Sequence, residues 1–156
     1  GDISLTTNLV SPDIAAILNI GDSHLLNLKS KEGIAKAKME ITEALKKDGV
    51  LIYNIDDETL RKEVPNYKVD ERVLTFGMDD SADYKIEKIS SSYQGIDFKH
   101  NSDIFSLKLV GDHQIYNAGF AAMVASLLGL SYDEIQRGFT KCQSSKNRVF
   151  ILLCVL

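Results

Sequence analysis

The sequence contains no tryptophan, only two prolines and two cysteines, and no apolar run long enough to span a bilayer. Cys142 and Cys154 do not have the spacing of a metal site or of a redox motif, so the thiols predict neither a zinc module nor a disulfide scaffold. No signal peptide opens the chain. These absences together favour a cytoplasmic protein with reduced thiols.

The charge balance is mildly acidic, with a formal net charge of −4 and no visible basic stripe. Such a chain is a poor candidate for a nucleic-acid-binding surface. Its 156 residues are 44% hydrophobic and 26% charged, which is the composition of one ordinary soluble domain with a real core.

Short apolar runs that end in polar turns predict the buried strands of a mostly parallel sheet. These runs are Ile14–Leu18, Val50–Tyr53 and Val73–Phe76. One helix is predicted to follow the N-cap Ser30, with Glu32 in its first turn. A second, short helix is predicted from Glu58 to Glu63, and Pro65 ends it. This alternation is typical of α/β proteins, in which ligands bind at the carboxyl ends of the strands.

Between Tyr84 and Leu109 the pattern changes to a polar–apolar alternation with period two, which predicts a small antiparallel meander. His100 falls at a turn of this region and is predicted to be a solvated loop histidine. Ala118–Leu128 is apolar almost all round and predicts a deeply buried helix. A capping box at Ser131 opens a last helix, predicted from Tyr132 to Phe139.

One lysine of the helix that follows Ser30 lies on the apolar side. On a helical wheel Lys38 falls inside or at the margin of the apolar arc. The arc contains Ile34, Ala37, Ile41, Ala44 and Leu45. A lysine that faces a core loses hydration, which disfavours its ammonium form and makes the amine more reactive. The alternative is that Lys38 extends along the helix to water, and periodicity alone favours this alternative.

Two other groups of polar residues are candidates for binding. One gathers at the start of the helix predicted over Ala118–Leu128, where free backbone amides would face a ligand, although capping alone would also explain it. Its members are Asp112, His113, Gln114, Tyr116 and Asn117. The other is the pair Asp56–Asp57. It resembles a metal pair, but capping of the short helix is the preferred interpretation.

Two stretches resemble the motifs of the Mur ligases, the ATP-dependent amide-forming enzymes of peptidoglycan synthesis. The stretch from Asn19 to Ile41 is similar to T-N-I-G-x-x-H-x-x-x-x-G-S-x-x-x-I-A-x-A-K-x-E-I. The stretch that begins at Gly111 is similar to G-x-H-N-x-x-N-A-x-x-A. The resemblance runs from Gly1 to about Arg148 and is closest to the MurF type. It implies the fold of the central ATPase domain, a mostly parallel sheet flanked by helices.

The resemblance also implies a role for five residues. His24 would be a magnesium ligand, and Lys38 would be carbamylated by carbon dioxide and help to hold a second magnesium. Asn117 and Gln114 would lie at the adenine of ATP, and Arg148 would touch its phosphates. Formation of a carbamate requires a neutral amine, which agrees with the reactive lysine inferred from the helical wheel. The product is an anion whose oxygens suit a hard cation.

The sequence departs from the family pattern at five positions. Leu18 replaces a threonine, Lys29 a glycine, and Leu26 an acidic residue near the metal. Gln114 replaces an asparagine, which keeps the amide group on a longer side chain, and Asn147 replaces the glycine before the arginine. The loss of a carboxylate at Leu26 changes what the resemblance implies for the shape of the metal site.

Two parts of the family pattern are absent from these residues. No G-x-x-x-x-G-K-[ST] phosphate loop occurs in them, and a magnesium-binding glutamate in an E-M-G motif would lie upstream of Gly1. The chain also begins without methionine, so we expect a fragment. Residues 1–148 would be part of the central domain, lacking its first phosphate-loop unit, with 84–109 as an antiparallel subregion. Residues 149–156 form a tail of unclear origin.

By resemblance, the whole protein would join D-alanyl-D-alanine to UDP-MurNAc-tripeptide through an acyl phosphate, with ATP and Mg²⁺ and without nucleic-acid or membrane partners. One alternative is a glutamate ligase similar to folylpolyglutamate synthase (FPGS). The other is a non-catalytic truncated module. Such a module would either persist as a folded unit or pair with another copy through edges that its missing parts would cover. Without the phosphate loop, this chain alone is predicted to turn over no substrate.

Overall fold

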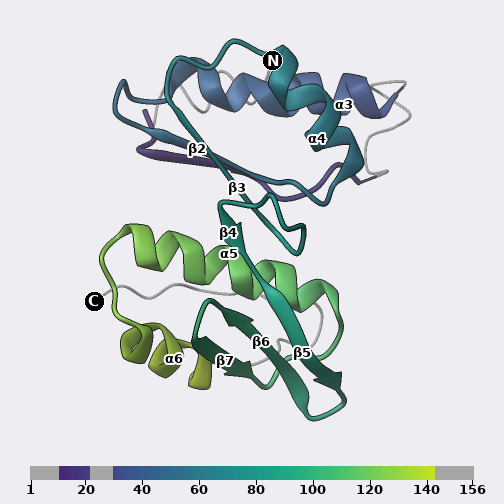
Figure 1. Cartoon of the computed structure of the whole chain (residues 1–156). Helices are drawn as coiled ribbons and strands as arrows, with labels where there is room; N and C mark the ends of the chain where they lie inside the picture. Colours follow the sequence, from purple (N-terminus) through teal and green to yellow (C-terminus); the bar gives the residue numbers. More distant parts are fainter. Residues whose placement is uncertain (1–10, 22–29, 143–156) are drawn as a thin grey trace. The chain divides into compact units, whose positions relative to one another are not determined.

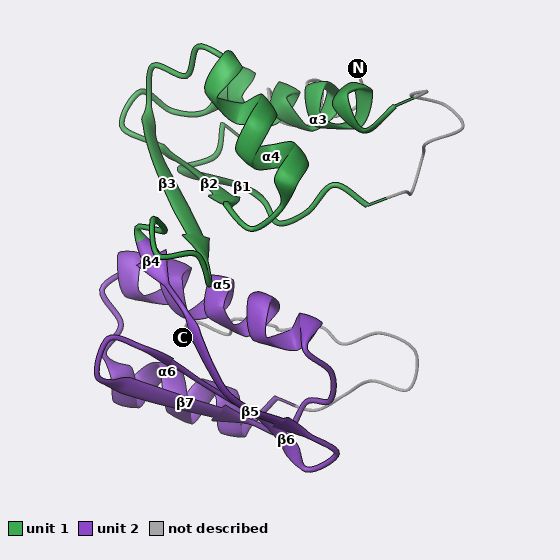
Figure 2. Cartoon of the chain, turned by 45° about the vertical axis from the view of Figure 1, so that its right-hand side comes forward, with its two compact units in different colours: residues 1–83 green, residues 84–156 purple. Residues whose placement is uncertain are grey.

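The structure is a computed structural model that describes residues 11–21 and 30–142 (Figure 1). The chain divides into two compact units, residues 1–83 and 84–156 (Figure 2). Each unit has its own sheet and its own covering helices. The predicted division into residues 1–148 and a tail from 149 to 156 stays a prediction, because the tail lies outside the described residues.

Unit 1 is built on parallel strands in the order β1-β2-β3. The strands are β1 (Ile14–Ile17), β2 (Val50–Asn54) and β3 (Arg72–Gly77). They agree with the predicted runs within two residues. The central strand β2 is buried over four successive residues, from Leu51 to Asn54, as expected of a parallel strand that is covered on both faces.

Helices α3 (Lys31–Met39) and α4 (Glu58–Glu63) lie side by side over one face of this sheet (Figures 1 and 2). Both begin at the predicted caps. The hydroxyl of Ser30 accepts from the backbone N–H of Gly33 at 3.1 Å, and the carboxylate of Asp57 accepts from that of Leu60 at 2.9 Å. The 3₁₀ turn η2 (Val64–Asn66) contains Pro65 and ends the second helix, as predicted.

The predicted buried face of α3 was wrong in part. The helix buries Ile34, Ala35 and Met39, whereas Ala37 is only half-buried. After Met39 the chain tightens into the 3₁₀ turn η1 (Glu40–Ala44), so the 100° step of an α-helix does not continue. Beyond this break Leu45 is buried, as the wheel predicted, while Ile41 and Ala44 are half-buried. The residues that the predicted arc left out, Ala35 and Met39, lie within the regular helix.

Unit 2 contains the predicted antiparallel meander, in the order β5-β6-β7. Its strands are β5 (Glu87–Ser92), β6 (Gly95–His100) and β7 (Asp103–Leu107), preceded by the two-residue strand β4 (Tyr84–Lys85). Helix α5 (His113–Leu127) packs on β6, and α6 (Tyr132–Thr140) packs on β7. The rings of Phe98, Phe105 and Phe139 meet between the sheet and α6.

The prediction for His100 was wrong. It is the last residue of β6 rather than a loop residue, and its ring stacks on that of Tyr84 with centroids 3.5 Å apart. Its Nδ1 bonds to the carbonyl oxygen of Lys85 at 2.8 Å. Burial raises the pKa of Tyr84 to about 12. The strand extends one residue further than the alternation indicated, because the turn begins only at Asn101.

Side chains of α6 cover the exposed edge of β7. The amide of Gln136 donates to the carbonyl of Ser106 at 3.1 Å and accepts from its N–H at 3.0 Å, and the Tyr132 hydroxyl donates to the carbonyl of Ile104 at 2.6 Å. An edge whose polar groups are occupied is a poor template for pairing with another copy. None of the helices in the described part of the chain combines the length and apolar character needed to cross a membrane.

The aromatic cluster of unit 2 generates a prediction about stability. Phe105 is 2% exposed, whereas its neighbour Ile104 is 51% exposed. We expect Phe105→Ala to lower the free energy of unfolding by about 3–5 kcal/mol, because it removes a buried ring and leaves a cavity. The matched control Ile104→Ala should change it by about 0.5 kcal/mol or less. Urea unfolding followed by circular dichroism measures both, and equal losses would contradict this account of the core.

Candidate functional site

The polar side chains of unit 1 gather at the carboxyl end of its parallel strands. Asn19 and Ile20 follow β1, Asp56 and Asp57 follow β2, and Asp79 follows β3. This is the end of an open α/β sheet at which ligands bind.

Lys38 reaches this end of the sheet from the last turn of α3. Its side chain is half-buried, and its Nζ donates to the carbonyl oxygen of Asn19 at 2.6 Å. The ammonium therefore ends on the chain that leaves β1. His24 and Arg148 lie outside the described residues, so the predicted pairing of His24 with Lys38 stays a prediction.

The acidic pair after β2 is engaged by backbone amides. Asp57 accepts from the N–H of Ile20 at 2.7 Å with one oxygen and caps α4 with the other. Asp56 accepts from the N–H groups of Met78 at 2.6 Å and Asp79 at 3.0 Å. Within residues 11–21 and 30–142, no group of three or more His, Cys, Asp or Glu is placed to hold a metal ion. The pair is thus a structural tie between strand ends, as the capping interpretation expected for Asp57.

Arg61 and Asp79 extend this network, and sequence reasoning missed both. The Arg61 guanidinium donates to the carbonyl of Ile55 at 2.9 Å and pairs with the carboxylate of Asp79. Hydrogen bonds from Ser81, and then from Arg61, hold the pKa of Asp79 well below its usual range. The two partners lie 18 residues apart, so no local pattern could have joined them.

At the start of α5 the structure places Gln114 and Asn117 together. Gln114 is 2% exposed, and its Oε1 accepts from Nδ2 of Asn117 at 3.2 Å while its Nε2 meets Nε2 of His113 at 2.8 Å. The predicted free backbone donors are not all available, since the N–H of Gln114 donates to Gly111 and that of Ile115 to Asp112. Of the two amide side chains, that of Asn117 is the more accessible, because Asn117 is only half-buried.

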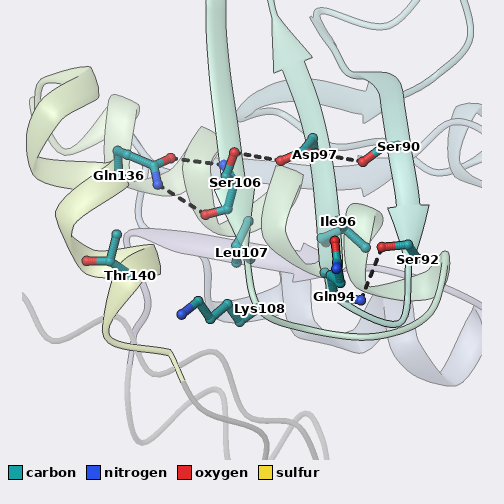
Figure 3. Close-up of a pocket in the computed structure, with 11 residues that line it drawn as sticks. Ser90, Ser92, Gln94, Ile96, Asp97, Ser106, Leu107, Lys108, Gln136 and Thr140 are labelled. Atoms are coloured by element: carbon teal, nitrogen blue, oxygen red, sulfur yellow. Dashed lines mark hydrogen bonds between the residues drawn. The ribbon is translucent and has the colours of Figure 1, made fainter.

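Unit 2 also carries a polar hollow of about 450 Å³ that contains none of the predicted site residues. Figure 3 shows a row of hydrogen bonds among the residues that line it, from Ser90 through Asp97 and Ser106 to Gln136. Both serine hydroxyls donate to Asp97 at 2.6 Å, and these bonds, that of Ser106 first, lower the pKa of Asp97. The period-two alternation puts these residues on one face, but it does not reveal that they form a row.

Comparison with known proteins identifies the family. The family model described as the Mur ligase middle domain matches residues 2–125. The chain belongs to the Mur ligase family. Among its Mur ligase relatives, the UDP-N-acetylmuramoyl-tripeptide–D-alanyl-D-alanine ligase of Bacillus subtilis is 37% identical over 142 residues. That match covers 90% of this chain and 30% of the relative.

Solved Mur ligase structures agree with the fold. Crystal structure I of MurF from Acinetobacter baumannii has a TM-score of 0.83 at 29% identity and covers 94% of this chain and 32% of that chain. MurF ligase from Thermotoga maritima, solved in complex with ADP, has a TM-score of 0.74 at 28% identity and covers 93% of this chain and 34% of that chain. This chain thus spans about a third of the length of these relatives.

The FPGS alternative is supported at the level of the fold alone. The apo form of L. casei FPGS has a TM-score of 0.64 at 18% identity and covers 87% of this chain. The higher identity of the MurF-type relatives favours the MurF reading of this Mur ligase chain.

The tie between Asp56 and the turn after β3 generates the second prediction. A Cβ added at Gly77 would lie 2.9 Å from the Asp56 carboxylate, so Gly77→Ala should displace it from the N–H groups of Met78 and Asp79. We expect a loss of about 1–3 kcal/mol in the free energy of unfolding, measured in urea. The control Gly138→Ala, where a Cβ meets nothing within 4 Å, should instead stabilise α6 by about 0.5–1 kcal/mol. No loss in Gly77→Ala would refute the tie.

The serine–aspartate row generates a prediction about pH. Because the folded pKa of Asp97 is lowered from 3.8, its contribution to stability is present above that value and is lost as pH falls through the folded pKa. Asp97→Asn cannot accept from both serines, so it should be less stable than the native chain at pH 7. The difference in the free energy of unfolding between the two chains should become smaller towards pH 2. Urea unfolding of both chains across this range measures it, and a gap that does not vary with pH would contradict the assignment.

Proposed function

We propose that this chain is the latter half of the central ATP-binding domain of a MurF-type ligase, and that the activity belongs to the whole protein. In that reaction, ATP phosphorylates the carboxylate of UDP-MurNAc-tripeptide to an acyl phosphate. The amine of D-alanyl-D-alanine then attacks the acyl carbon and expels phosphate. The observation that carries the proposal is the family match over residues 2–125, combined with the place of Lys38 at the carboxyl end of the sheet.

Lys38 is the residue we assign to magnesium, together with His24. The free amine of Lys38 would add to carbon dioxide and release a proton, which leaves a carbamate whose oxygens suit a hard cation. The position of the amine at the end of β1, on a half-buried residue, is consistent with this donor set. When bound, the ion would neutralise charge as the phosphoryl group is transferred. The carboxylates of Asp56 and Asp57 would stay with the backbone.

The nucleotide would be held by residues of unit 2. We assign Gln114 and Asn117 to the adenine, because their amides are joined at the start of α5 and supply both donors and acceptors. Arg148 would steady the phosphates as a planar cation with several donors. The ADP complex of the T. maritima relative supports a nucleotide as the ligand. Cytoplasmic location follows from these substrates, and self-association of the shortened chain stays a hypothesis.

The test is a ligase assay on the whole protein that contains this chain. With UDP-MurNAc-tripeptide, D-alanyl-D-alanine, ATP and Mg²⁺, we expect peptide product and phosphate in equal amounts. Lys38→Ala should lower kcat by at least about 100-fold, since it removes a group that holds the metal. The control Lys36→Ala changes an exposed lysine two positions away on the same helix and should retain activity. Product formed from folate and glutamate instead would favour the FPGS alternative.

The 156-residue chain alone should show no magnesium-dependent ATP hydrolysis above the buffer background, because it contains no G-x-x-x-x-G-K-[ST] loop. Measurable hydrolysis by the purified chain, abolished by chelation of magnesium, would contradict this part of the proposal.

A further inference from the structure

One peptide group at the end of β1 is held at both of its ends by charged side chains. The peptide joins Asn19 to Ile20. Its carbonyl oxygen accepts from Lys38 Nζ at 2.6 Å, and its N–H donates to Oδ2 of Asp57 at 2.7 Å. The lysine comes from α3 and the aspartate from the cap of α4, so this one peptide connects two helices that are separate in sequence.

The two contacts reinforce each other electrically. A carboxylate at the N–H end and an ammonium at the carbonyl end both match the direction of the peptide dipole. Both hydrogen bonds involve an ion and are of the stronger kind. In a chain of hydrogen bonds each member polarises the next, so the charge on Asp57 makes the Asn19 carbonyl a better acceptor for Lys38. The peptide therefore links the carboxylate of Asp57 to the ammonium of Lys38.

Asp57 is itself fixed in place. Its second oxygen accepts from the N–H of Leu60 at 2.9 Å, and Leu60 is 0% exposed in the core of unit 1. The carboxylate cannot turn away from Ile20 without giving up the cap of α4. The core therefore fixes Asp57 through Leu60, Asp57 fixes the Asn19–Ile20 peptide, and the peptide holds the ammonium of Lys38.

We propose that Asp57 is a positioning residue that sets the place of the Lys38 amine through the Asn19–Ile20 peptide. The use made of that amine rests on the proposed function, whereas the positioning does not. Asp57 acts through the peptide in this arrangement, since both of its carboxylate oxygens are bound to backbone N–H groups. Of the pair Asp56–Asp57, it is Asp57 that contributes to the site, by fixing a lysine.

The decisive variant is Asp57→Asn in the full 156-residue chain. Asparagine is as good an N-cap as aspartate, so its single side-chain oxygen can keep the bond to Leu60 while its NH₂ group faces the N–H of Ile20. The matched control is Asp13→Asn, which removes the same charge from an exposed carboxylate of unit 1 that pairs with Lys46. Samples free of nucleotide, magnesium and bicarbonate keep Lys38 as an unmodified amine.

The measurement is nuclear magnetic resonance of the ¹⁵N-labelled chain. We expect a resolved ammonium signal for Lys38 in the native chain and in Asp13→Asn, because its protons are held by the Asn19 carbonyl. In Asp57→Asn the signal should disappear. Hydrogen exchange of the Ile20 amide should be at least about tenfold faster there, with that of Leu60 unchanged. An Asp57→Asn chain that keeps the Lys38 signal would overturn the proposal, as would a native chain without it.

A reciprocal variant covers the case in which Asp57→Asn does not fold. Lys38→Met removes the ammonium but keeps the length of the side chain, so it should speed exchange of the Ile20 amide without affecting Leu60. Unchanged exchange at Ile20 would refute the coupling. Neither measurement uses ATP. The positioning of Lys38 by Asp57 can therefore be refuted while the ligase assay succeeds, and the ligase assay can fail while the positioning is confirmed.

Discussion

The arrangement of unit 1 depends on two adjacent carboxylates that accept hydrogen bonds from the backbone of three separate loops. Parallel strands end together and leave N–H groups that no neighbouring strand can satisfy. Asp57 satisfies one after β1 and one at the start of α4, and Asp56 satisfies two after β3. These loops also form the end of the sheet at which ligands bind in open α/β folds. The hydrogen bonds of Asp56 and Asp57 therefore fix the backbone around any site at this end.

The same solution recurs elsewhere in the chain. Asp83 accepts from both the N–H and the hydroxyl of Thr75 and closes the loop after β3, and Gln136 occupies the edge of β7. In the described part of the chain, no buried side-chain nitrogen or oxygen lacks a hydrogen-bond partner. Satisfied polar groups of this kind favour one arrangement of the loops, since breaking the part-buried bonds would cost the pairing of their donors.

The elements of the fold could be read from the sequence because their causes are local. Apolar runs gave the strands of unit 1, Ser30 and Asp57 gave the helix starts, and alternation gave the meander. What the sequence did not reveal depends on contacts between distant residues. Asp56 meets Met78 across 22 positions, and His100 meets Lys85 across 15, so no window of sequence contains either pair. The break of α3 at Met39 was missed because a helical wheel assumes that the helix continues.

For the candidate site, the resemblance to the Mur ligases identified Lys38, Gln114 and Asn117. The structure places the lysine at the end of β1 and the two amides in contact with each other. What fixes the lysine, the peptide between Asn19 and Ile20, has no side chain and therefore leaves no mark in the sequence. The chemistry proposed for Lys38 is most directly tested by ¹³C nuclear magnetic resonance of the whole protein in ¹³C-bicarbonate with ATP and Mg²⁺, with Lys38→Arg as reference. The account predicts a carbamate signal that is absent from Lys38→Arg. An active ligase with no such signal at saturating bicarbonate would contradict it.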